Sequence, residues 1–168
     1  MSVLRTLALI VTFVVVWPAL ASASVKVTFV HPEQYSDPDL RGGFGSVRRE
    51  ATLPEIKRYL EQLGSRYLKP GEVLRIEVLD IQLAGQYEPW RPQLSDVRIL
   101  RDVTPPRFKL RYRLEARGRV QLSAEEAVSD INYLMNPSAR FSSDRLVYEK
   151  AMLADWFRRR IGERKPAA

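Results

Sequence analysis

A row of basic residues at every second position is the feature of this sequence best suited to chemistry. Residues 107–115 read RFKLRYRLE, and this period of two predicts a β-strand with one buried face. Cations on the other face would lie about 6.7 Å apart, and a hairpin at Arg117-Gly118 would extend the row. We therefore expect a basic binding face made of Arg107, Lys109, Arg111, Arg113 and Arg119, with Arg117 beside it.

Such a face suits an anionic partner if helices cover the apolar side of the same sheet. The alternative is an ordinary solvated face, on which Glu77 or another acid from a neighbouring strand pairs with the arginines. The sequence leaves both interpretations open.

Carboxylates beside apolar segments are the second candidate group, since a catalytic pair or a metal site needs two or three of them within a few Å. They lack the spacing of an EF-hand loop, and the sequence does not establish whether Asp80, Asp130 and Glu149 converge. The acids concerned are Asp80, Asp96, Asp130, Glu149 and Asp155.

The sequence contains few residues suited to other kinds of catalysis or metal binding. The chain has one histidine, His31, and no cysteine, which excludes a cysteine nucleophile and argues against zinc sites. The stretch Gly43-Phe44-Gly45-Ser46 matches neither a nucleophile elbow nor a phosphate-binding loop. We expect Tyr87 and Trp90 to anchor a loop and Trp156-Phe157 to lie in the core. No catalytic residue, metal ligand or cofactor is therefore assigned.

The first 23 residues have the three parts of a secretory signal peptide. Arg5 precedes an apolar run from Leu7 to Val16, and Ala21-Ser22-Ala23 is a small-residue cleavage site. The run stops at Trp17-Pro18, short of the roughly 20 residues that span a bilayer, so an uncleaved anchor is the weaker alternative. We expect a mature domain of residues 24–168 without a transmembrane segment, located in the periplasm or secreted. A lipid-modified lipoprotein is excluded because cysteine is absent.

The charge balance points to the class of partner. There are 27 Lys and Arg against 20 Asp and Glu, a net charge of +7. An exported basic protein meets anionic envelope components or acidic proteins more readily than nucleic acid, so we expect no nucleic-acid partner.

The elements that position these groups begin with a strand at residues 25–30, followed by a long loop at 31–51. Thr52 and Glu55 fit a capping box, which predicts that a helix starts there and ends at the turn 69–71. The strand 73–84 follows, and its apolar phase changes between Val78 and Leu79. The change indicates either a β-bulge or a strand covered on both faces. Without a bulge Asp80 would be semi-buried, and we expect its partner to be Arg98, Arg107 or Lys150.

The rest of the chain supplies further strands and one helix. Gly85 ends the long strand, a loop covers 86–94, and a short strand is expected at 96–101 before the clear strand 107–116 and its hairpin partner. Residues 123–134 are ambiguous, and we favour a strand over 128–134 rather than a helix. A last helix, capped by Ser142 or Ser143, runs to Gly162. The result is an α+β fold, a mostly antiparallel sheet of about five strands with two amphipathic helices packed on one face.

Four stretches in order resemble one family, the domain-of-unknown-function family numbered 3016, whose members are uncharacterised proteins exported by proteobacteria. The stretches are Leu83-Ala84-Gly85, residues 106–114, Ser129-Asp130-Ile131-Asn132-Tyr133 and residues 148–157. The resemblance implies a single small exported domain from a Gram-negative bacterium, and it implies no activity. Members of this family often carry an acid where this chain has Gln82, which weakens any acid pair built on Asp80.

The sequence thus favours a non-enzymatic binding or accessory protein whose basic face meets an anionic envelope component or an acidic protein. One alternative is a hydrolase or metal-dependent enzyme that uses Asp80, Asp130 and Glu149. Another is a protein-binding module that acts by strand addition at the edge formed by Val25 to Val30.

Overall fold

The computed structural model describes residues 22–41, 45–88, 98–137, 139 and 141–164. The main elements are β1 (Ser24–Phe29), α1 (Gly45–Tyr67), β2 (Glu72–Gln82), β3 (Gln86–Tyr87), β4 (Arg98–Ile99), β5 (Arg107–Ala116), β6 (Arg119–Ser129) and α2 (Val147–Phe157). Short 3-10 helices lie at η1 (Pro32–Gln34), η2 (Pro38–Leu40) and η4 (Tyr133–Met135), and a π-helical turn, η5 (Arg158–Gly162), continues α2. The predictions for residues 1–21, Gly43-Phe44, Trp90 and Asp96 lie outside the described residues.

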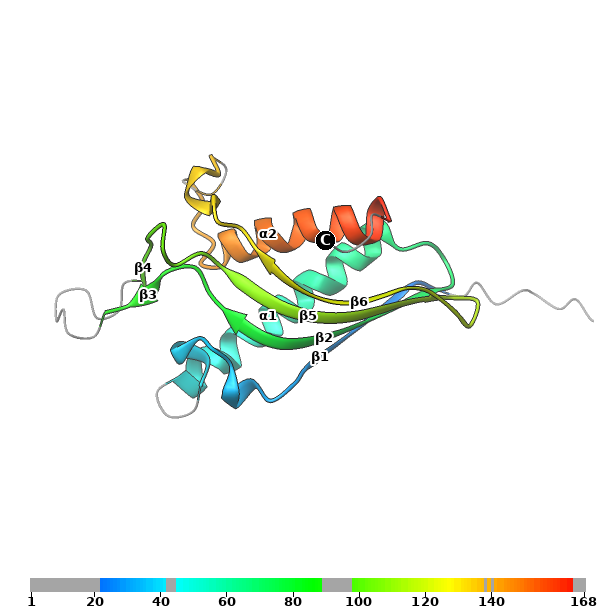
Figure 1. Ribbon diagram of the computed structural model, residues 1–168, viewed down its shortest axis with the longest axis horizontal. Helices are drawn as coiled ribbons and strands as arrows, with labels where there is room; N and C mark the ends of the chain where they lie inside the picture. Colours follow the sequence, from blue (N-terminus) through cyan, green and yellow to red (C-terminus); the bar gives the residue numbers. More distant parts are fainter. Residues whose placement is uncertain (1–21, 42–44, 89–97, 138, 140, 165–168) are drawn as a thin grey trace, which may run out of the picture.

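Strands β1, β2, β5 and β6 form one sheet in the order β1-β2-β5-β6, and β3 pairs with β4 in a separate two-stranded sheet (Figure 1). β1 runs parallel to β2, and the other pairs are antiparallel. The expected sheet of about five mostly antiparallel strands is therefore corrected to a mixed four-stranded sheet among six described strands. The reason is that α1 connects β1 to β2, and a connection of that length permits parallel pairing.

Both helices pack on one face of the four-stranded sheet, as the sequence predicted. Along β5 exposed and buried residues alternate from Arg107 to Leu114, so one face carries the core and the other meets solvent. The helices contribute apolar stripes to that core, which includes Ile56, Leu60 and Leu63 of α1, Leu153, Trp156 and Phe157 of α2, and Phe108, Leu110 and Leu114 of β5. The aromatic pair Trp156-Phe157 is buried, as expected. No described helix is long and apolar enough to cross a membrane.

Helix α1 lies so close to β1 that one position excludes a side chain. A Cβ atom added to Gly64 would lie 2.0 Å from Cγ2 of Val25, well inside van der Waals contact. Glycine at this position lets the first strand of the sheet pack directly on the helix.

The start of α1 differs from the prediction. The helix begins at Gly45 rather than at Thr52, so Thr52 and Pro54 lie inside it. The Thr52 hydroxyl accepts a hydrogen bond from Nη1 of Arg145, a tertiary partner that a local capping pattern does not reveal. The expected loop 31–51 is correspondingly shorter and contains η1 and η2.

A β-bulge explains the change of apolar phase in β2. The register with β5 shifts between Val78 and Asp80, which leaves Leu79 as the extra residue. Beyond the bulge Ile81 lies opposite Phe108 in the core, and Asp80 lies opposite Lys109 on the solvent side. The bulge interpretation is confirmed.

The hairpin at Arg117-Gly118 is confirmed, with positive φ angles of 51° and 71°, as a type I′ turn requires. β6 then continues through Ser123 and ends at Ser129, so the strand favoured over 128–134 was wrong for most of its length, and Tyr133–Met135 form η4. α2 begins at Val147 with no side-chain cap, so the expected cap at Ser142 or Ser143 was also wrong. Gly162 ends the last helical turn, as predicted.

Candidate functional site

The solvent face of the four-stranded sheet, which we call the open face, carries the predicted row of cations. Arg107, Lys109, Arg111 and Arg113 alternate with buried residues on β5 and are all exposed. Register adds Arg75 opposite Arg113 and Lys26 opposite Arg75, because paired residues on neighbouring strands project from the same face. The structure therefore brings four of the five predicted basic-face residues together with two more cations.

Arg119 is placed differently. It pairs with Ala116, which by alternation along β5 projects from the same side as the buried Leu114. A register shift between Leu114 and Glu115 accompanies this change. Arg119 therefore does not extend the row around the hairpin.

Acids on neighbouring strands pair with the centre of the row. Glu125 of β6 contacts Nζ of Lys109 at 2.9 Å and Nη2 of Arg111 at 2.8 Å, and Glu77 of β2 lies 2.9 Å from Nη1 of Arg111. Hydrogen bonds from Lys109 and then Arg111 lower the pKa of Glu125. The hydrogen bonds that Arg111 donates to Glu125 and Glu77 raise the pKa of Arg111. The pairing by Glu77 foreseen as an alternative is present.

Asp80 also lies on the open face, with a partner that the sequence did not suggest. Its carboxylate accepts from the backbone N–H and from the hydroxyl of Ser36, both at 2.6 Å. The expected partners are occupied elsewhere or have different neighbours: Arg98 bonds two aspartates, Lys150 bonds Glu55 and Asp144, and Arg107 lies opposite Gln82 and Ser129. Asp80 thus fixes the segment after β1 to the bulge of β2.

Two carboxylates are buried on the other side of the same strand end. Asp37 accepts from the N–H of Leu83 at 2.7 Å, and Glu149 accepts from the N–H of Ala84 at 2.7 Å. Desolvation by burial raises the pKa of both groups, and Arg98 counteracts this effect. The other Glu149 oxygen, Oε2, has no hydrogen-bond partner among the described residues. A loop segment without periodicity supplies Asp37, so no sequence pattern revealed this pair.

Arg98 connects this pair to a pocket. Its Nη2 donates to Asp37 at 3.2 Å and to Asp39 at 2.9 Å, and its guanidinium lies 5.3 Å from the centroid of the Tyr87 ring. The pocket, of about 450 Å³, lies between η2, the end of β2, strands β3 and β4, and the start of α2. Its wall includes Asp39, Leu83, Ala84, Tyr87, Arg98 and Tyr148.

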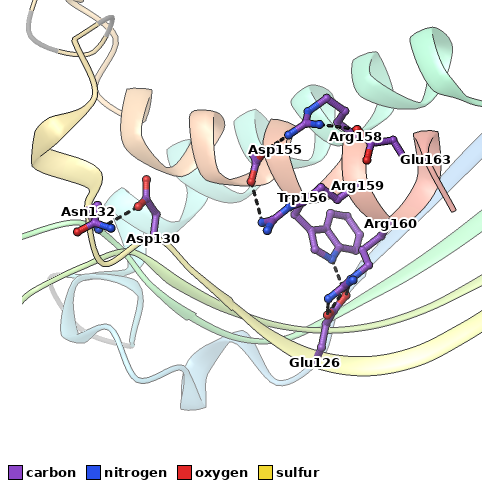
Figure 2. Close-up of polar contacts among 9 residues, drawn as sticks. All are labelled: Glu126, Asp130, Asn132, Asp155, Trp156, Arg158, Arg159, Arg160 and Glu163. Carbon is purple, nitrogen blue, oxygen red and sulfur yellow. Dashed lines mark hydrogen bonds and ion pairs between the residues drawn. The ribbon is translucent and has the colours of Figure 1, made fainter. Parts of the chain in front are cut away.

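The remaining predicted acids have local partners, which Figure 2 shows. Asp130 accepts from the backbone N–H of Asn132 at 3.0 Å, and Asp155 pairs with Arg158 and Arg159 of the following turn. Asp80, Asp130 and Glu149 therefore make separate contacts. Within the described ranges, no group of three or more His, Cys, Asp or Glu side chains is arranged to hold a metal ion.

Glu126 is a charged residue that the sequence reasoning missed. It projects from β6 toward α2 and accepts from Nε1 of Trp156 at 2.7 Å (Figure 2). It also accepts from the hydroxyl of Tyr112 at 2.9 Å. Arg160 donates three further hydrogen bonds to the same carboxylate. Glu126 alternates with Ala124 and Val128 on the side of β6 that faces the core. An acid at a position of this kind could have been identified from the sequence.

The edges of the sheet are β1 and β6, and in the part of the chain that the structure describes neither pairs with a further strand. His31, which has a positive φ of 49°, lies in the turn after β1, and its Nδ1 contacts Glu33. Neither the edge strands nor His31 places a catalytic group on the open face.

Comparison with known proteins confirms the resemblance noted in the sequence. The family model described as Protein of unknown function (DUF3016) matches residues 23–159. No curated protein matches this chain. A solved structure titled a minor lipoprotein from Acinetobacter baumannii is similar to this chain, with 16% sequence identity and a TM-score of 0.28. The match covers 89% of this chain and 98% of the other chain. A TM-score this low supports no inference about the fold or function of this chain.

Proposed function

This chain belongs to the family of proteins of unknown function DUF3016, and on the basis of its surface we propose that it is an exported, non-enzymatic binding protein. The open face is its binding surface, and the partner is an anionic component of the cell envelope. The observation that carries the proposal is the row of exposed cations on a sheet face that the two helices leave uncovered.

Cations outnumber acids on the open face. Among the described residues, alternation and register give six cations, Lys26, Arg75, Arg107, Lys109, Arg111 and Arg113, against four acids, Glu77, Asp80, Glu115 and Glu125. The excess has the same sign as the net charge of +7 of the whole chain. A positive potential over this face would concentrate anionic partners near it.

The ion pairs on the open face do not prevent binding. In the pair formed by Arg111 and Glu77, the two side chains are 55% and 45% exposed, and ion pairs of this kind are weak because water screens them. A phosphate or carboxylate of the partner can therefore replace Glu77. Arg107, at the start of β5, is exposed and forms no ion pair with any described residue.

The proposal is tested by neutralising three cations, Lys109→Gln, Arg111→Gln and Arg113→Gln, in one variant. Glutamine is chosen because glutamate beside Glu77 and Glu125 would add like-charge repulsion, which destabilises a sheet. The matched control is Lys57→Gln, Arg58→Gln and Arg66→Gln, three exposed positions on α1. Both variants lose the same charge, so only its position differs.

Cosedimentation with phosphatidylglycerol vesicles is the measurement, at low and raised salt. We expect the wild type and the α1 control to bind at low salt and to be released by salt, since exposed charges are screened. The open-face variant should bind at least about tenfold more weakly, a difference of roughly 1.4 kcal/mol. Equal loss in both triple variants would show that net charge alone drives binding, and unchanged binding of the open-face variant would refute the proposal.

A further inference from the structure

The pocket beside Arg98 lies apart from the open face and suits a different kind of ligand. Its volume of about 450 Å³ lies within the range of roughly 300–1,000 Å³ that is typical of small-molecule sites. We propose that this pocket binds a small uncharged ligand that carries hydroxyl and amide groups, of the size and chemistry of an N-acetylated hexosamine.

The charge of the pocket wall indicates an uncharged ligand. Arg98 is paired with Asp37 and Asp39, and Arg145 is paired with Glu55. Asp144 lies 2.6 Å from Nζ of Lys150. Because these charges are already compensated within the protein, a charged ligand would bring in a charge without a partner, which is costly in a partly desolvated site.

A polar atom of the pocket wall indicates that the ligand carries hydrogen-bonding groups. Arg98 lines the pocket, and its Nε atom is buried and has no acceptor among the described residues. Buried polar atoms are nearly always hydrogen-bonded, so a ligand that offers an acceptor would satisfy this atom. Hydroxyl and amide groups both offer acceptors without carrying a charge.

Apolar and aromatic side chains complete the wall. Leu40, Leu83, Leu146 and Val147 line the pocket together with the rings of Tyr87 and Tyr148. The Tyr148 ring is positioned by an edge-to-face contact with Tyr133 at 4.9 Å between centroids. A sugar ring with an acetyl group matches this mixture, because its C–H faces and methyl group are apolar and its rim is polar.

Three compounds that share one scaffold test the proposed ligand class. N-acetylglucosamine is neutral, glucosamine is cationic and N-acetylmuramic acid is anionic at neutral pH. Each is titrated into the full mature protein while backbone amide chemical shifts are recorded. We expect N-acetylglucosamine to shift the amides of Leu83, Ala84 and residues 146–148 with a dissociation constant of about 1 mM, and the charged compounds to bind at least about tenfold more weakly.

A blocking variant tests the site itself. Ser143 lines the pocket and is exposed, so Ser143→Trp should fill the mouth of the pocket without disturbing the core. Ser65→Trp, at an exposed position of α1, is the matched control. Binding of N-acetylglucosamine should be lost in Ser143→Trp and unchanged in Ser65→Trp.

The outcomes separate this proposal from the one for the open face. Absence of shifts with all three compounds, shifts outside the pocket, or binding that Ser143→Trp leaves intact would each overturn the pocket as the site. Equal binding of a charged compound would overturn the uncharged class. Binding of the neutral compound should not depend on salt, whereas binding at the open face should, so either proposal can fail without the other.

Discussion

The indole Nε1 of Trp156 donates a hydrogen bond of 2.7 Å to Oε1 of Glu126, which joins the last helix to the edge strand of the sheet. The Glu126 carboxylate also accepts from Tyr112 and Arg160, and its side chain is only 10% exposed. Burial raises the pKa of Glu126, but the hydrogen bonds from Arg160, Trp156 and Tyr112 outweigh that effect and lower it. The Glu126 carboxylate of β6 thus links β5 and the end of the last helix through hydrogen bonds.

Replacing Glu126 by alanine should lower the free energy of unfolding by about 2 kcal/mol, because three donors lose their acceptor in a mostly buried position. Urea denaturation measures the change. The matched control is Glu125→Ala, one residue away on the exposed side of β6, where only surface ion pairs are lost. Glu125→Ala should leave stability nearly unchanged, and equal effects of the two substitutions would contradict the structural role of Glu126.

Glu149 should make the protein less stable as pH rises. Burial raises its pKa in the folded state above the ordinary value of 4.5, so between these two values the native protein binds more protons than the unfolded chain. The free energy of unfolding then falls as pH increases through this window, by at most about 1.4 kcal/mol per pH unit. Below pH 4.5 both states are protonated and the contribution is fully present.

The isosteric substitution Glu149→Gln isolates this effect. Gln can still accept from the N–H of Ala84 but does not ionise, so the difference in stability between the variant and the wild type should change in favour of the variant as pH rises from 5 to 8. Denaturation curves at several pH values check this. A difference that is independent of pH would show that Glu149 ionises in the folded protein as readily as in the unfolded chain.

Gly64→Ala should destabilise the protein, although alanine favours a helix by about 1 kcal/mol over glycine. The new Cβ atom would lie 2.0 Å from Cγ2 of Val25, and such overpacking costs about 1–3 kcal/mol. Ser65→Ala, at the next and exposed position of α1, should have little effect or stabilise. Urea denaturation compares the two variants.

A second substitution identifies the cause. Val25→Ala removes Cγ2, the atom that the new Cβ atom would overlap, so the double variant should be more stable than the sum of the two single effects predicts. Additive effects would contradict the close approach of α1 and β1.

Local patterns were sufficient for several features of this fold. The alternation in β5 and the turn at Arg117-Gly118 depend on residues adjacent in the chain, and the structure confirms both. The phase change at Leu79 left two interpretations open, and the register of β2 with β5 decided for the bulge. The start of α1 could not be found in the same way. Thr52 and Glu55 form a plausible local cap, but in the fold both contact Arg145, 93 and 90 residues away.

The candidate sites show the same division. The sequence by itself determined that Lys109, Arg111 and Arg113 share an exposed face, because the period of a strand assigns faces without reference to any other element. Only the tertiary structure decided that Glu77 and Glu125 pair with this row, that Asp80 is bonded to Ser36, and that Asp37 and Glu149 are buried against the end of β2, where Arg98 bonds Asp37. These contacts join segments far apart in the chain, and strand pairing and helix packing bring such segments together in ways that local periodicity does not encode.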